Sequence, residues 1–226
     1  MAKSNMEKRV LKTEPKLNVD LNAEQKEVAK LIYEHDIVFI LGTFGTGKSL
    51  TATHTALTMF RKKQFNKIWI TRPIIKNNLG ILPGSIDEKL NPYIYPLVQN
   101  LEVCQGKELT QKMRDAGLIE IMPLDVCKGV TFMDSIVIVD EFQDMKMADF
   151  RTICSRLGKT SKMIFCGSIE QIDASIGHHS CIHEIQKLRK WPKVGYKVLE
   201  SDHRNLIVRE LFNYLENNGT TEEGNS

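Results

Sequence analysis

The sequence lacks any long hydrophobic run. No apolar stretch among its 226 residues approaches the ~20 residues that a helix needs to cross a bilayer. The N-terminus is charged and does not follow the pattern of a secretory signal. We therefore expect a cytoplasmic protein that does not bind a membrane.

Cysteine pairs that could build a disulfide framework or a zinc ribbon are also missing. The five cysteines are odd in number, and none forms a C-x-x-C pair. The sequence has no internal repeat and no low-complexity block. A hydrophobic content of 42% in 226 residues is enough for a real core. A chain of this size buries about 70% of its unfolded surface without covalent staples.

A strong excess of one charge is likewise absent. The formal net charge is +3, and the first sixteen residues, with five Lys and Arg against two Glu, already account for it. The remainder is close to neutral, so composition does not indicate a nucleic-acid binder, and any such surface must be local. We expect residues 1–16 to be a charged flexible arm, 17–215 a single domain and 216–226 a disordered tail.

One specific motif stands out against these absences. The segment Gly42-Thr43-Phe44-Gly45-Thr46-Gly47-Lys48-Ser49 fits the phosphate-loop pattern G-x-x-x-x-G-K-[ST], directly after the apolar run 37–41. Glycines let successive N–H groups point at a phosphate, Lys48 reaches the β- and γ-phosphates, and the Ser49 hydroxyl can ligate Mg²⁺. A Gly-rich turn before a capped helix is the plainer alternative. We expect ATP and Mg²⁺ as cofactors, with the nucleotide contacted by Gly42, Thr43, Phe44, Gly45, Thr46, Gly47, Lys48, Ser49 and Leu50.

A second part of the same site follows another apolar run. Residues 135–139 are mostly β-branched and end in Asp140 and Glu141. Such runs are buried parallel strands, whose carboxyl ends line the ligand crevice of an open α/β sheet. Asp140 is placed to hold Mg²⁺, and Glu141 to orient and deprotonate the attacking water. Two acids after a strand are also common as plain turn residues, but together with the phosphate loop they indicate hydrolysis.

Strand-like and helix-like segments alternate along the chain. We expect strands at 37–41, 67–71, 118–122, 136–139, 163–166 and 196–199, and helices at 22–33, 147–157, 179–189 and 205–215, with one after the phosphate loop to 59. The Pro- and Gly-punctuated stretch 72–96 is expected to be irregular with one short helix. The pattern predicts an α/β fold, a P-loop core with a mostly parallel sheet flanked by helices on both faces.

Three further polar residues each fit two roles. Gln25 completes a capping box with Asn22, and it also stands where helicase-like ATPases place a glutamine on the edges of adenine. Gln171, after the strand at 163–166, is interpreted as a γ-phosphate sensor or as a surface glutamine. Arg204 precedes the last expected helix and is either an arginine finger or an ordinary surface arginine.

Taken together, these pieces resemble the PhoH-like ATPases, relatives of superfamily 1 helicase cores. The resemblance covers residues 21–215. It is carried by the phosphate loop and by Leu21-Asn22-Ala23-Glu24-Gln25, Thr71-Arg72-Pro73, Leu82-Pro83-Gly84-Ser85, Lys128-Gly129-Val130-Thr131-Phe132, Val139-Asp140-Glu141-Phe142-Gln143, Gln171-Ile172-Asp173 and His203-Arg204.

The resemblance implies a RecA-like or helicase-like ATPase core, commonly assembled as a homo-oligomeric ring, with a hexamer favoured. It implies that Arg72 contacts a nucleic-acid backbone and that Arg204 reaches a neighbour's site. The partner is then RNA or single-stranded DNA. The short stand-alone layout is similar to that of phage- or bacterium-encoded members.

Two departures from the family pattern matter. Gly167-Ser168 stands where the family usually has Gly-Asp, which removes an acid near Gln171. Relatives that cleave RNA carry an additional nuclease-type domain, and we see no room for one, so we expect no ribonuclease activity. The main hypothesis is an ATPase with Lys48, Glu141, Gln171 and Arg204 as catalytic residues. Its rivals are an ATP-dependent switch that recruits protein partners and, less favoured, a kinase.

Overall fold

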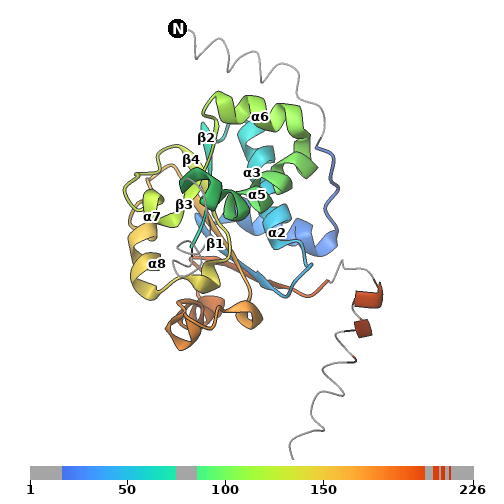
Figure 1. The fold of residues 1–226 in the computed structure, drawn as a ribbon, viewed down its shortest axis with the longest axis vertical. Helices are drawn as coiled ribbons and strands as arrows, with labels where there is room; N and C mark the ends of the chain where they lie inside the picture. The colour runs from blue at the N-terminus through green and yellow to red at the C-terminus, as the bar shows by residue number, and fades with distance from the viewer. Residues whose placement is uncertain (1–16, 75–85, 202–205, 209, 212–213, 215–226) are drawn as a thin grey trace, which may run out of the picture.

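A computed structural model describes residues 17–74, 86–201, 206–208, 210, 211 and 214, with the backbone alone described for 86–90. Six parallel strands form one sheet in the order β3-β2-β4-β5-β1-β6 (Figure 1). The strands are β1 Ile37–Gly42, β2 Lys67–Arg72, β3 Ile119–Pro123, β4 Ser135–Val139, β5 Lys162–Gly167 and β6 Gly195–Leu199. The six predicted strands are confirmed, and the sheet is parallel throughout the described residues.

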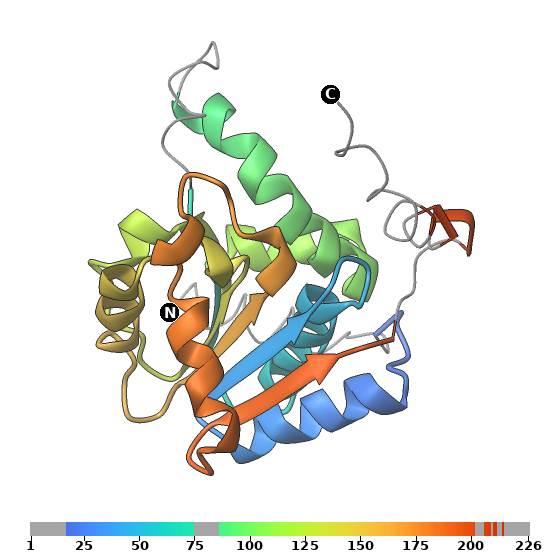
Figure 2. The ribbon, with the colours of Figure 1, turned by 90° about the horizontal axis from the view of Figure 1, so that it is seen from below.

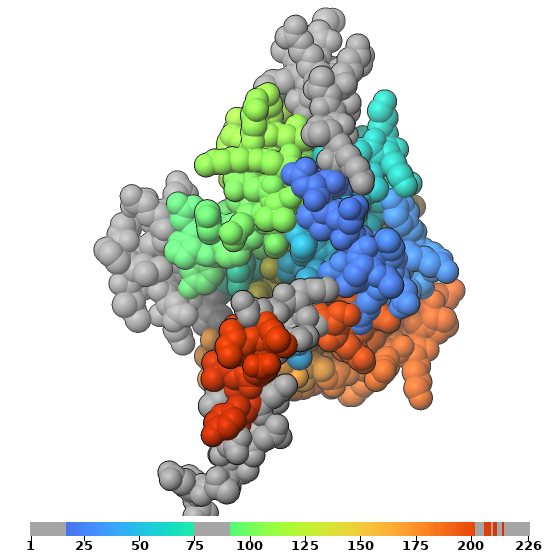
Figure 3. Space-filling view, turned by 90° about the vertical axis from the view of Figure 1, so that its right-hand side faces the viewer, coloured from blue at the N-terminus to red at the C-terminus, as the bar shows by residue number. Residues whose placement is uncertain are grey.

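Helices cover both faces of this sheet, as the sequence predicted. One face carries α2 Ala23–Glu34, α3 Lys48–Arg61, α5 Ile86–Gln105 and α6 Lys107–Asp115. The other carries α7 Leu124–Cys127, α8 Met147–Cys154 and α9 Ile182–Ile185. Turned by 90°, the ribbon shows α2 running beside β6 and β1 (Figure 2), and in the space-filling view α2 lies between the α5–α6 region and the C-terminal strand (Figure 3).

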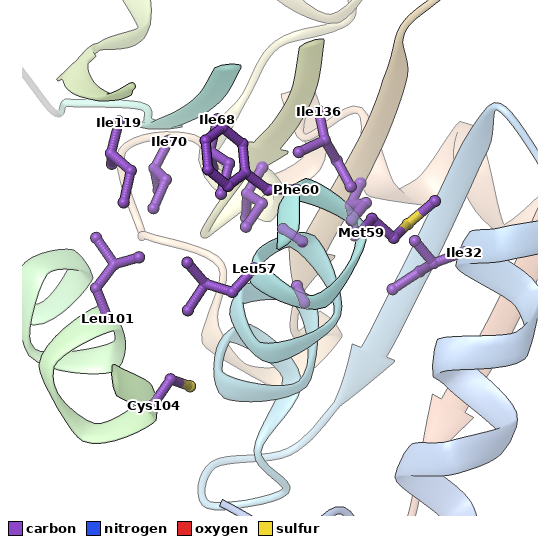
Figure 4. Close-up of a cluster of buried hydrophobic side chains, with 14 of the residues drawn as sticks. Ile32, Leu57, Met59, Phe60, Ile68, Ile70, Leu101, Cys104, Ile119 and Ile136 are labelled. Atoms are coloured by element: carbon purple, nitrogen blue, oxygen red, sulfur yellow. The ribbon is translucent and has the colours of Figure 1, made fainter. Parts of the chain in front are cut away.

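Alternation along the strands divides the core into two clusters. In β1, Val38 and Ile40 pack toward α2 and α3, whereas Phe39 and Leu41 pack toward α8 and α9. All four side chains are buried, and each such burial contributes about 1.5–3 kcal/mol. Figure 4 shows the first cluster, in which Leu57 of α3 and Leu101 of α5 face Ile68 and Ile70 of the sheet.

The stretch after β2 differs from the prediction. Residues 75–85 lie outside the described part, but residues 86–105 form one long helix, α5, instead of a short one. Pro92 and Pro96 lie inside it, and each removes a backbone donor. Leu97, Leu101 and Cys104 are buried at helical spacing against the core, so tertiary packing outweighs the two prolines.

Two other segments also depart from the expectations. The helix predicted at 179–189 is broken into the 3-10 turn η4 Gly177–His179, the short α9 and the 3-10 turn η5 Gln186–Lys190. Helix α6 was missed because its sequence, KELTQKMRD, is almost entirely polar. Of the helix predicted at 205–215, the structure describes helical residues at 206–208, 210, 211 and 214. Among the described helices, none is both long and apolar enough to span a bilayer.

Candidate nucleotide site

The phosphate loop joins β1 to α3 and contains two glycines in the left-handed region. Gly45 has φ 76°, and Gly47, the residue that caps α3, has φ 78°. Among the described residues, no side chain makes a capping hydrogen bond to the first turn of α3. Exposed N–H groups at a helix N-terminus after a glycine-rich loop form an anion-binding site.

Lys48 lies folded back on its own loop. Its Nζ donates to the carbonyl oxygens of Gly42 at 2.8 Å and Thr43 at 2.7 Å. Burial lowers the pKa of the ammonium group. The carbonyl contacts hold the cation at the centre of the loop, where a phosphate oxygen would compete for it.

Ser49 and Asp140 meet, although they are far apart in sequence. The Ser49 Oγ donates to Asp140 Oδ1 at 2.5 Å. Asp140 is only 6% exposed at the end of β4, and its backbone N–H donates to the carbonyl of Thr71. Burial, and next the charge of Glu141, raise the pKa of Asp140 to about 6. A hydroxyl and a carboxylate so close together fit Mg²⁺, a hard cation that prefers oxygen ligands.

Glu141 follows in a backbone conformation that is uncommon for a residue with a side chain. Its φ is 52° and its ψ 40°, which is the left-handed region. Such conformations cost about 1–3 kcal/mol and cluster at functional sites. Its carboxylate accepts a hydrogen bond from Gln143 Nε2 at 2.6 Å and lies 3.9 Å from Arg72 Nη2. The strained turn therefore places Glu141 beside Asp140 at the carboxyl end of the sheet.

Gln143 is a site residue that the sequence analysis did not single out. It belongs to the 3-10 turn η2, Phe142–Asp144, and it is 1% exposed. The available signal was a polar residue two positions after Glu141 in the segment shared with the family. Its burial could not be inferred, because it depends on the neighbouring end of β5.

Gln171 ends the 3-10 turn η3, Ile169–Gln171, after β5. Its Nε2 is buried and has no hydrogen-bond partner within the described part of the chain, and the same is true of the Ser168 hydroxyl. An unpaired buried donor needs an explanation in a folded protein. The position of Gln171 after a strand next to β1 agrees with a ligand-facing role, which stays a prediction.

Gln25 forms the capping box that the sequence allowed. Its N–H donates to Asn22 Oδ1 at 2.8 Å, and its Oε1 accepts from the Asn22 N–H at 3.1 Å. The other end of the amide lies against the phosphate loop, because a Cβ on Gly47 would stand 2.6 Å from Gln25 Nε2. The two roles considered for Gln25 are thus compatible in geometry.

Of the remaining predicted site residues, the structure describes Phe44 and Leu50 but not Arg204. Phe44 is 59% exposed on the loop. Leu50 is partly buried, with its side chain packed against the core. Arg204 lies outside the described residues. Ser201, the last described residue before it, donates its N–H to Glu24 at 3.0 Å.

A cleft of about 430 Å³ is lined by residues that follow Arg72 and Glu141 in the chain. Pro73 and Ile74, which follow Arg72, form one wall, and Asp144 and Ser175 line it further. Lys128 also faces it and is held by Asp125 at 2.6 Å and Asp149 at 2.7 Å. The cleft is polar and opens at the carboxyl ends of the strands, where open α/β sheets bind ligands.

The chain is similar to known proteins over most of its length. The family described as PhoH-like protein matches residues 19–215. A PhoH-like protein of Bacillus subtilis (strain 168) is 34% identical over 189 residues, which are 83% of this chain and 59% of that protein. A PhoH-like protein of Mycobacterium bovis is 36% identical over 69% of this chain and 45% of its own length. The chain spans about half the length of these curated relatives.

Solved structures show the same core at low identity. The large terminase of a thermophilic bacteriophage aligns with 87% of this chain and 50% of its own, at a TM-score of 0.56 and 11% identity. The UvsW helicase of bacteriophage T4 aligns with 88% of this chain and 67% of its own, at 0.50 and 14%. At these identities the likeness establishes the fold alone. Because the family matches nearly all described residues, this chain belongs to the PhoH-like proteins, P-loop NTPases with a helicase- and terminase-like core.

Proposed function

We propose that this protein binds ATP with Mg²⁺ and hydrolyses it. The observation that supports the proposal best is the meeting of Ser49, from the start of α3, with Asp140, from the end of β4, beside Lys48 and Glu141. Lys48 would leave its loop carbonyls for the β- and γ-phosphates, and Ser49 and Asp140 would hold Mg²⁺. The bound ion would neutralise negative charge on the phosphates.

Glu141 is the proposed base. One oxygen of its carboxylate, Oε2, accepts from Gln143, and the other, Oε1, lies 3.9 Å from Arg72 Nη2, beyond direct hydrogen-bonding distance, so Oε1 is the atom that would accept from a water. Gln171 is the proposed γ-phosphate sensor, because its buried Nε2 lacks a partner. The Nε2 of Gln25, which lies against Gly47, is the proposed adenine contact.

Two variants test hydrolysis together. Lys48→Ala should abolish tight ATP binding in a folded protein, because the phosphates lose their main side-chain cation. Glu141→Gln should bind MgATP normally and lower kcat by about 10²–10⁴-fold, the usual contribution of a general base. Binding measured by calorimetry and phosphate release measured in parallel separate the two effects. Full turnover in either folded variant contradicts the assigned role.

We further propose that the substrate of this ATPase is RNA or single-stranded DNA and that the protein works as an oligomeric ring. Support comes from the cleft that is lined by Pro73 and Ile74, which follow Arg72 in the chain, and by Asp144, which lies three residues after Glu141. A nucleic-acid strand bound in this cleft would contact the loop that carries Glu141, the proposed general base. ATP turnover should therefore rise on addition of RNA or single-stranded DNA, in a salt-dependent way. If neither RNA nor single-stranded DNA changes the rate of ATP turnover, the result favours the alternative, an ATP-dependent switch that recruits protein partners.

A further inference from the structure

The amide of Gln143 is bonded at both ends and cannot be turned around. Its Oε1 accepts from the backbone N–H of Ser168 at 3.0 Å, and its Nε2 donates to Glu141 Oε2 at 2.6 Å. The N–H of Ser168 can only donate and an ionised carboxylate can only accept, so the two partners fix which end of the amide faces which. Gln143 therefore links the end of β5 to the carboxylate of Glu141.

The surroundings of Gln143 leave it no other position. The Ser180 hydroxyl donates to its backbone carbonyl. A Cβ on Gly167 would lie 2.8 Å from Gln143 Oε1 and 2.7 Å from the ring of Phe142, so only a glycine lets the amide come so close to β5. Phe142 itself is fully buried, with its ring 5.6 Å from that of Phe165. The turn η2 is thus held at the end of β5 by the Gln143 side chain and by ring packing, and its backbone is held by Ser180.

Glu141 has little else to hold it. Its side chain is 30% exposed, and the closest Arg72 nitrogen is 3.9 Å away, beyond direct hydrogen-bonding distance. Among the described residues, the hydrogen bond from Gln143 is the one that fixes the carboxylate. It occupies Oε2 and leaves Oε1 for a water.

We propose that Gln143 is a positioning residue that aims Oε1 of Glu141 at the attacking water. The inference rests on the proposed hydrolysis of ATP. In that reaction the water proton passes to Oε1 while the water oxygen bonds to the γ-phosphorus. The bond from that phosphorus to the bridging oxygen breaks, and ADP leaves with the bond's electrons. Gln143 touches neither nucleotide nor water, and it acts through the direction it gives to Glu141.

Two substitutions test this role. Gln143→Met removes both hydrogen bonds at nearly unchanged size. Gln143→Glu keeps the acceptor for Ser168 but replaces the donor with a second carboxylate that repels Glu141. Both variants should lower kcat by about 10–100-fold, as expected for a misaimed catalytic group, and leave the affinity for MgATP unchanged. Gln105→Met is the matched control, since Gln105 is also a buried amide but lies in α5 beside Thr110.

A double-mutant cycle with Glu141→Gln separates positioning from mere structure. If Gln143 acts through Glu141, Gln143→Met should lower kcat in the wild-type background and have no further effect in the Glu141→Gln background. Multiplicative losses, or a loss equal to that of the folded Gln105→Met control, would falsify the positioning role while leaving the ATPase proposal intact. If Glu141→Gln alone keeps wild-type turnover, the role of Glu141 and this inference fall together.

Discussion

At the scale of single residues, Asp140 carries an electrostatic penalty that its proposed role at Mg²⁺ would explain. Burial and the neighbouring Glu141 raise the pKa of its carboxyl from 3.8 to about 6, against the opposing hydrogen bond of Ser49 and the charges of Arg72 and Lys48. An acid whose pKa is higher in the folded state binds its proton more tightly there. Its contribution therefore favours folding most at low pH, declines as the pH rises from 3.8 to about 6, and is constant above that window.

Asp140→Asn should accordingly stabilise the protein in nucleotide- and magnesium-free buffer. The amide keeps an acceptor for Ser49 without a buried charge, and the gain at pH 7 should be on the order of 1–3 kcal/mol in the free energy of unfolding. The gain should shrink as the pH falls below about 6 and vanish near 3.8, where the wild-type carboxyl is also neutral. Urea unfolding at several pH values measures it. A pH-independent difference, or a less stable variant at pH 7, contradicts this account.

At the scale of elements, the first turn of α2 combines a structural and a proposed binding role in Gln25. Gln25→Glu retains an oxygen for the Asn22 N–H and so preserves the capping box, but it loses the Nε2 donor that lies beside Gly47. We expect unchanged stability and a loss of preference for ATP over GTP. Competition binding of the two nucleotides gives the measurement.

Asn22→Ala provides the control for this comparison. It removes the acceptor for the Gln25 N–H, so it should lower stability by about 1 kcal/mol and leave the nucleotide preference intact. If Gln25→Glu keeps the wild-type preference for ATP over GTP, Gln25 acts only as part of the helix cap.

The elements also show how far the sequence could predict this molecule. The strands and the phosphate loop were predicted well, because buried β-branched runs and a glycine-rich loop are local signals. Helix α5 was not, because two prolines in its sequence argued against a helix that distant packing stabilises. The motifs singled out Lys48, Ser49 and Asp140, which the structure brings together, and their roles stay predictions. The hydrogen bond between Gln143 and Ser168 could not be predicted from the sequence, because it depends on β4 and β5 being neighbours.

At the scale of the whole molecule, Arg204 tests whether active sites are shared between subunits. An arginine finger stabilises transition-state charge in the neighbouring site and not in its own. Arg204→Ala should therefore bind ATP and hydrolyse it poorly. Mixing it with Lys48→Ala subunits should restore part of the activity, because intact phosphate loops then face intact arginines. Phosphate release from the mixture, compared with the sum of the two parents, is the measurement.

Co-purification of differently tagged subunits is the control for that experiment. If the two variants co-assemble and turnover stays at the sum of the parents, Arg204 acts within its own chain or only structurally. The ring proposal would then lose its main support.

The sheet order has a consequence for how the protein is made. β1, with the phosphate loop, and β4, with the acids, form no ladder with each other, and β5 lies between them and pairs with both. Strand β5 is Lys162–Gly167, which follows both in the chain. A nascent chain that has emerged only as far as Asp140 holds every residue of the Ser49–Asp140 contact but lacks the strand that brings them into one sheet. Because such long-range parallel pairing forms slowly, we expect the Ser49–Asp140 contact to form only after β5, which ends at Gly167, has been synthesised.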